Sequence, residues 1–144
     1  MSALTSVDMR KKTSFTAIVA AVVLAHLVAN LIHGAAHEAL AVTLPAWKNG
    51  FVYAVILVAP LVALALIWRG RMRAGHGLLL VSMAGSFGFA TLHHFVWQSA
   101  DHVSHIAAND WGTAFTVTAT ATAVLQVFGC GLAIAGLRRE PRSA

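Results

Sequence analysis

The amino-acid sequence predicts an all-α integral membrane protein, with residues 1–144 forming a single domain of four membrane-spanning helices. Hydrophobic residues make up 58% of the chain and charged residues only 10%, and the mean hydropathy is +0.75. A soluble domain has about a quarter of its residues charged, so these few charges cannot cover a water-exposed surface. The apolar residues fall into four stretches, each able to supply the roughly 20 residues of a membrane helix. We expect helices at about 14–41, 51–68, 77–105 and 113–137.

The first stretch follows a basic segment, which is also how a signal peptide begins. It contains the polar residues His26, Asn30 and His33, however, and it has no cleavage site of small residues. We therefore expect this stretch to be retained as the first helix.

The second and fourth stretches contain residues that affect helix geometry and packing. Pro60 lies inside the second stretch and is expected to kink it, because proline removes a helical hydrogen bond. The fourth stretch carries five threonines, whose hydroxyl groups usually bond to their own helix or to a neighbouring one. They are Thr113, Thr116, Thr118, Thr120 and Thr122. We expect these threonines to contribute to packing.

The basic residues predict the orientation of the helices. All of the ten lysines and arginines except Lys48 fall into three groups. The groups are Arg10, Lys11, Lys12; Arg69, Arg71, Arg73; and Arg138, Arg139, Arg142. Because cytoplasmic segments are enriched in basic residues, both termini and the 69–76 connection are expected in the cytoplasm. This placement accounts for the net charge of +5 without a nucleic-acid surface.

A weak internal repeat relates the first and third helices. Residues 25–37 align with residues 93–105 at an offset of 68. The matching positions are mostly polar, and they pair His26 with His94, Asn30 with Gln98, His33 with Asp101, and His37 with His105. We predict two tandem two-helix repeats, related by a parallel pseudo-twofold axis along the membrane normal. Binding sites commonly form where such halves meet.

The polar positions of each repeat lie on one face of a helix, because residues seven and eleven positions apart differ in direction by only about 20°. The two resulting stripes are His26, His33, His37 and His94, Asp101, His105. Ionisable side chains are costly when they face lipid, so both stripes are expected to face the bundle interior.

Part of each stripe has the spacing of a metal site. In His33-x3-His37 and in Asp101-x3-His105, two ligands lie one helical turn apart on the same face. If the two pairs face each other, they provide three nitrogens and one oxygen. Copper, iron, zinc, nickel or manganese could accept this set, so the sequence leaves the identity of the metal open.

His26 and His94 form a second pair about 10 Å deeper in the membrane. This pair is expected to hold a second metal ion or to bind a haem b from both sides. Asn30 and Gln98 are expected to support the ligands through hydrogen bonds. Glu38 and His102, beside the stripes, are expected to add a ligand or to shuttle protons.

Other residues are expected to have structural roles. A buried histidine can simply hydrogen-bond to a neighbouring helix, and this is the expectation for His76 and His93. The lone Cys130 excludes an internal disulfide and a cysteine-rich metal site.

The sequence supports four hypotheses about function. The first is a membrane metalloprotein with a mono- or binuclear centre in the outer half of the bundle, active in redox or metal-handling chemistry. The second is a b-type haem protein that exchanges electrons with quinone through His26 and His94. The third is a metal-ion carrier, and the fourth is a small structural subunit of a larger membrane complex. No catalytic residue can be assigned, and the sequence does not decide whether the protein is an enzyme.

The expected partners follow from the same properties. They are the lipid bilayer, a quinone or redox partner, and further copies of the chain or a larger membrane complex, with no nucleic acid. The expected location is a bacterial inner membrane, with the histidines toward the periplasmic side.

Overall fold

The computed structural model describes residues 2–139, and the surroundings of side chains from residue 13 onward. Every regular element in this range is a helix. Four helical segments are long and apolar enough to cross a membrane: Thr13–Ala39, Ala46–Trp68, Met72–Val96 and Asp110–Arg139. The predicted all-α fold with four candidate spans is therefore confirmed, and these spans suggest an integral membrane protein.

The first and fourth spans each lie in a single helix, which is α1 (Ser2–Ala39) for the first and α5 (Asp110–Arg139) for the fourth. The second and third spans are each composed of several helical segments. The second consists of α2 (Ala46–Phe51), the π-helical segment η1 (Val52–Val58) and α3 (Ala59–Trp68). The third consists of α4 (Met72–Thr91) and the π-helical segment η2 (Leu92–Val96), and the 3₁₀ turn η3 (Val103–His105) follows it.

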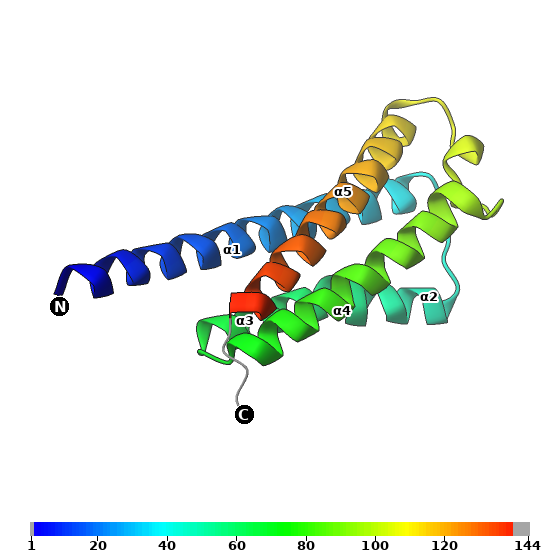
Figure 1. Ribbon diagram of the computed structural model, residues 1–144. Helices are drawn as coiled ribbons and strands as arrows, with labels where there is room; N and C mark the ends of the chain where they lie inside the picture. Colours follow the sequence, from blue (N-terminus) through cyan, green and yellow to red (C-terminus); the bar gives the residue numbers. More distant parts are fainter. Residues whose placement is uncertain (1, 140–144) are drawn as a thin grey trace.

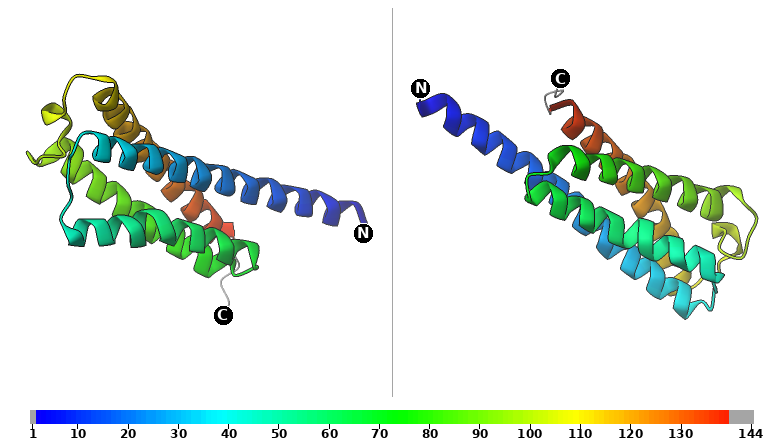
Figure 2. Two further views of the ribbon diagram at one scale, coloured as in Figure 1. Left: turned by 180° about the vertical axis from the view of Figure 1, so that it is seen from behind. Right: turned by 90° about the horizontal axis from the view of Figure 1, so that it is seen from below.

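Successive spans run in opposite directions (Figure 1). Helix α5 packs against α1 and α4, and α4 also packs against α3, whereas α1 and α3 share a shorter contact. Figure 2 shows that the tight turn after α3 and the end of α5 lie at the same end of the bundle, beyond which α1 projects. Two of the predicted basic groups therefore lie at this end. Arg142 is outside the described residues, and only the backbone is described for residues 10–12.

The π-helical segment of the second span lies directly before Pro60. Proline has no N–H to donate to the carbonyl four residues earlier, and its ring crowds that carbonyl. The structure accommodates Pro60 by widening the preceding turns, so that the N–H of Ala59 bonds to the carbonyl of Ala54, five residues back. The irregularity predicted at Pro60 thus takes the form of a π-helical segment.

The third span ends at Val96, whereas the sequence predicted a helix continuing to residue 105. Trp97 has extended backbone angles, although its N–H still closes a π-type hydrogen bond to the carbonyl of Leu92. Asp101 therefore lies in an irregular turn and His105 in the 3₁₀ turn, so they do not share a helical stripe with His94. The internal repeat stays a prediction.

Apolar and polar contacts are divided between the two ends of the bundle. A core of small and aliphatic side chains fills the end near the tight turn, and comprises Val19, Val23, Ala63, Leu64, Ile67, Leu79, Met83 and Ala133. Most of the buried polar side chains lie toward the opposite end, among them His33, Lys48, His93, His94, Asp101 and Thr118. The chemistry of this protein is therefore concentrated at one end of an apolar bundle.

Close packing at the apolar end leads to a first prediction. A Cβ atom added at Gly136 would overlap the ring of His76, which is held by a 2.9 Å hydrogen bond from its Nδ1 to the carbonyl of Met72. Gly136→Ala is therefore expected to lower the free energy of unfolding by about 1–3 kcal/mol, the usual cost of overpacking.

Thermal unfolding in a mild detergent measures this effect. Gly131→Ala is the matched control, because no atom lies within 4 Å of a Cβ added at this position of the same helix. Equal stability of the two variants would contradict the predicted close contact.

Candidate metal centre

Three histidines from two spans converge in the polar half of the bundle. His33 and His37 come from the last turns of α1, and His94 comes from η2. One ring nitrogen from each lies within 4.8 Å of the other two. Phe115 of α5 is fully buried against all three rings, with centroid distances of 4.5, 4.8 and 5.3 Å to His33, His37 and His94. A rigid aromatic ring therefore supports one side of the cluster.

The end of α1 holds His37 in position. Ala41 adopts a left-handed conformation with φ of 52°, which reverses the chain, and the N–H of Val42 then bonds to the carbonyl of His37. This turn brings the carbonyl of Val42 to 3.1 Å from Nδ1 of His37, which donates to it. The helix cap thus also fixes the orientation of the imidazole ring.

The irregular turn after the third span holds His94. Nδ1 of His94 donates to the backbone carbonyl of Asp101 at 2.8 Å. If the helix continued past Val96, the carbonyl of Asp101 would accept a helical hydrogen bond from the N–H four residues later. Because the helix ends first, this carbonyl is free to accept the hydrogen bond from His94. Asp101 was predicted to contribute a carboxylate ligand, but in the structure its backbone oxygen orients His94.

His33 is held by the fourth span. Its Nδ1 lies 3.0 Å from Oγ1 of Thr118. The hydroxyl of Thr118 donates to the carbonyl of Ala114 at 2.6 Å, so its oxygen accepts a hydrogen from His33. Back-bonding to its own helix was predicted for Thr118, but its contact with an imidazole was not.

These contacts determine which nitrogen of each ring carries the hydrogen. Nδ1 faces an acceptor in all three histidines, so the hydrogen of the neutral imidazole lies on Nδ1 and Nε2 presents a lone pair. Nε2 of His33 and Nε2 of His94 lie only 3.2 Å apart. Two lone pairs at this distance repel each other unless a proton or a metal ion lies between them.

Lys48 is a buried residue of the site that the sequence analysis missed. Its Nζ donates to Nδ1 of His93 at 3.1 Å and to Oδ2 of Asp101 at 3.4 Å. Lys48 is only 9% exposed. The signal in the sequence was its isolation, because it is the only lysine or arginine outside the three basic groups. His93, expected to have only a structural role, is thereby linked to the site.

The carboxylate of Asp101 is stabilised as an anion. Burial alone raises the pKa of this carboxyl group, but the hydroxyl of Ser99 and the ammonium of Lys48 outweigh burial, so the pKa of Asp101 is below its ordinary value. Asp101 therefore pairs as an anion with Lys48 while its backbone carbonyl binds His94. One residue connects the ion pair to the cluster.

The remaining predicted residues lie apart from the three-histidine cluster. Nε2 of His26 accepts a hydrogen bond from Nε2 of Gln126 at 3.3 Å, so the expected pairing of His26 with His94 is replaced by separate partners. Asn30 donates to the carbonyl of His26. Gln98 is exposed beyond the end of the third span.

The outer histidines form a separate pair. His102 is buried and His105 is exposed, and their ring centroids lie 5.6 Å apart. Nδ1 of His105 bonds to the carbonyl of Ser99, and Nδ1 of His102 bonds to the hydroxyl of Ser104. His105 was predicted to be a ligand alongside His37, but it does not belong to the cluster.

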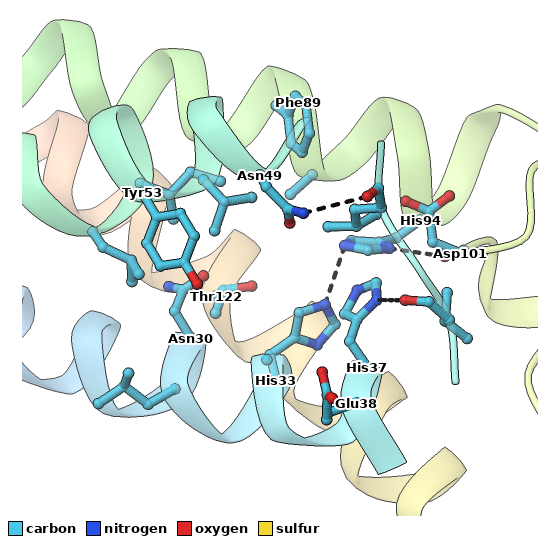
Figure 3. A pocket seen from close by; sticks show the side chains of 18 of the residues that line it. Asn30, His33, His37, Glu38, Asn49, Tyr53, Phe89, His94, Asp101 and Thr122 are labelled. Carbon is cyan, nitrogen blue, oxygen red and sulfur yellow. Dashed lines mark hydrogen bonds between the residues drawn. The ribbon is translucent and has the colours of Figure 1, made fainter. Parts of the chain in front are cut away.

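A cavity of about 620 Å³ adjoins the cluster. His33, His37 and His94 line one part of it, and Glu38, Asn30, Thr122 and Gln126 also line it (Figure 3). The three imidazoles therefore face a space that can admit a small molecule. The chain matches no protein-family model, no curated protein and no solved structure.

The ion pair leads to a second prediction. Lys48→Met leaves the carboxylate of Asp101 buried without its cation, and we expect a loss of about 3 kcal/mol in the free energy of unfolding, the typical cost of breaking a buried pair. Unfolding in detergent at pH 7 measures the loss.

The double variant Lys48→Met/Asp101→Asn is the control, because it removes the unpaired charge. It is expected to be more stable than the sum of the two single changes implies. Additive losses would show that the two side chains do not stabilise each other.

Proposed function

We propose that this chain is a membrane metalloprotein in which His33, His37 and His94 bind one transition-metal ion through Nε2. The observation that carries the proposal is the 3.2 Å approach of two Nε2 atoms whose rings both use Nδ1 as the donor. A metal ion accepts both lone pairs and removes their repulsion. Histidine is also the most common metal ligand in proteins.

The spacing and the surroundings of the nitrogens support an ion. A tetrahedral ion with metal–nitrogen bonds of about 2.0–2.1 Å separates its ligands by about 3.3 Å, close to the observed distance between His33 and His94. Histidine ligands of metals usually donate their other N–H to a carbonyl or hydroxyl group of the protein. All three rings have such an acceptor in Val42, Asp101 or Thr118.

The donor set narrows the choice of metal and indicates the kind of site. Three imidazoles suit zinc, copper, iron or nickel, whereas manganese prefers oxygen ligands. Three protein ligands leave a coordination position open, which is typical of catalytic rather than structural sites. The adjoining cavity supplies space at that position, and this favours redox or other chemistry on a bound molecule.

The geometry favours a metal ion over a haem. The haem hypothesis needs His26 and His94 on opposite faces of a porphyrin. In the structure His94 lies beside His33 and His37, and His26 is bonded to Gln126. Three nitrogens within 4.8 Å of one another suit a single ion at their centre.

We further propose that the cluster lies on the outer side of the membrane, toward the periplasm of a bacterium. Arg69, Arg71, Arg138 and Arg139 occur at the end of the bundle opposite to the cluster. The enrichment of basic residues on the cytoplasmic side supports this orientation. Trp47 and Trp97 are more than 60% exposed at the cluster end, as expected of an interfacial aromatic belt.

Metal analysis tests the proposed function directly. Protein purified in mild detergent is expected to contain about one zinc, copper, iron or nickel ion per chain by mass spectrometry, because one three-histidine site is present. His33→Ala/His94→Ala is expected to lose the metal. His105→Ala is the matched control and should retain it, since His105 lies outside the cluster. A metal-free wild-type protein, or a double variant that retains the metal, would disprove the proposal.

The hydroxyl of Thr118 provides a finer test. Thr118→Val removes the acceptor that orients His33 while the ligands themselves are kept. We expect metal affinity, measured by competition with a chelator, to fall by about 10–100-fold, as is typical when such a supporting hydrogen bond is lost.

Thr120→Val is the matched control on the same helix. The hydroxyl of Thr120 is exposed and bonds only to the carbonyl of Thr116, so the metal affinity of this variant should equal that of the wild type. A similar loss in both variants would indicate a general effect on α5 rather than on His33.

A further inference from the structure

The cavity beside the cluster opens between the first two spans. Its lining residues come from the outer part of α1, from the 41–44 connection, from α2 and η1 of the second span, from α4, η2 and Asp101, and from α5. Helices α1 and α3 share only a short contact, so the space between α1 and the second span is not closed by helix packing. A volume of about 620 Å³ lies within the range of sites for small molecules, about 300–1,000 Å³.

The cavity is bordered by exposed side chains of the candidate membrane spans. Leu31 is 57% exposed and Tyr53 is 65% exposed, and both line the cavity from within candidate membrane spans. Figure 3 shows Tyr53 of the second span extending toward Asn30 of α1. With these spans in a bilayer, a ligand entering between Leu31 and Tyr53 would come sideways from the lipid, so it would have to be soluble in the membrane.

The cavity wall contains a buried hydrogen-bond acceptor without a donor. Gln126 is 1% exposed, and its Nε2 donates to His26. Among the described residues, no donor reaches Oε1 of Gln126. The hydroxyl of the neighbouring Thr122 cannot serve, because it donates to the carbonyl of Ala119. An unpaired buried acceptor is unfavourable, and a hydroxyl group on a ligand would satisfy it.

One part of the wall is apolar and partly aromatic. Phe89 and Tyr53 line the cavity together with Ile56 and Leu57. Flat aromatic side chains pack well against a ring, and the aliphatic side chains suit an apolar tail. The site therefore combines a hydroxyl acceptor, ring-shaped neighbours and access from lipid.

We propose that this cavity binds a membrane-soluble quinol, with one ring hydroxyl donating to Oε1 of Gln126 and the apolar tail leaving between α1 and η1. The inference rests on the proposed function only for what the metal ion does with the bound quinol. Binding itself uses Gln126 and the apolar part of the wall, formed by Tyr53, Ile56, Leu57 and Phe89, and none of these residues is a proposed metal ligand.

The reduced and oxidised forms of one head group provide the test. Tetramethylhydroquinone donates hydroxyl hydrogens, whereas its quinone offers only acceptors. Both are titrated by calorimetry, without oxygen, into chelator-treated full-length protein in lipid nanodiscs. We expect the hydroquinone to bind about tenfold more tightly, the effect of one hydrogen bond to a buried acceptor. Equal affinities, or tighter binding of the quinone, would overturn the proposal.

Three variants locate the site. Gln126→Met keeps the size of the side chain and removes the acceptor, so it should abolish the preference for the hydroquinone. Leu31→Trp narrows the opening and should weaken binding of the hydroquinone at least about tenfold. Ile32→Trp is its matched control, since Ile32 is 45% exposed and does not line the cavity. Wild-type affinity in Leu31→Trp would overturn the lateral entrance, even if Gln126→Met fails to fold.

This experiment separates the two proposals because it uses metal-free protein. Preferential binding of the hydroquinone by a protein that never contains metal would support the quinol site and contradict the metal site. A stoichiometric metal ion without this preference would do the reverse.

Discussion

The structure depends on one constraint, which is that polar groups inside an apolar bundle must find their partners within the protein. Three imidazoles meet this constraint in the same way, because each donates from Nδ1 to an acceptor on another segment. The acceptors are the carbonyls of Val42 and Asp101 and the hydroxyl of Thr118. Satisfying Nδ1 leaves Nε2 of each ring free, and the free nitrogens converge. The reversal after α1, the end of the third span and the register of α5 all serve these three hydrogen bonds.

The same constraint explains why the two ends of the bundle differ. At the apolar end, glycines such as Gly75 and Gly136 allow backbones and side chains to approach closely, which is how membrane helices associate when no water is present to drive burial. At the cluster end, the imidazoles and the pair of Lys48 with Asp101 need hydrogen bonds more than close packing. The looser contact between α1 and the second span can therefore contain a cavity without loss of the apolar core.

The sequence predicted the parts of the structure that follow from regular helices. Hydropathy identified four spans, and the four-residue spacing of His33 and His37 brings both rings into one cluster because α1 continues without a break to Ala39. The same reasoning failed for the third span, because η2 changes the helical period and the helix ends at Val96. Lys48, Thr118 and Gln126 could not be found by periodicity, since their roles depend on which helices become neighbours.

The departures from regular geometry are themselves informative, because such strain is retained mainly where it serves a site. Ala41 is the only residue other than glycine with positive φ among residues 2–139, although a glycine would adopt that conformation without cost. The π-helical segments η1 and η2 replace α-helical turns in the second and third spans. Ala41, four residues of η1 and His94 of η2 all line the same cavity. Helical regularity is therefore given up around one space, the space that the three imidazoles face, and this concentration favours the proposed site over buried histidines that serve only packing.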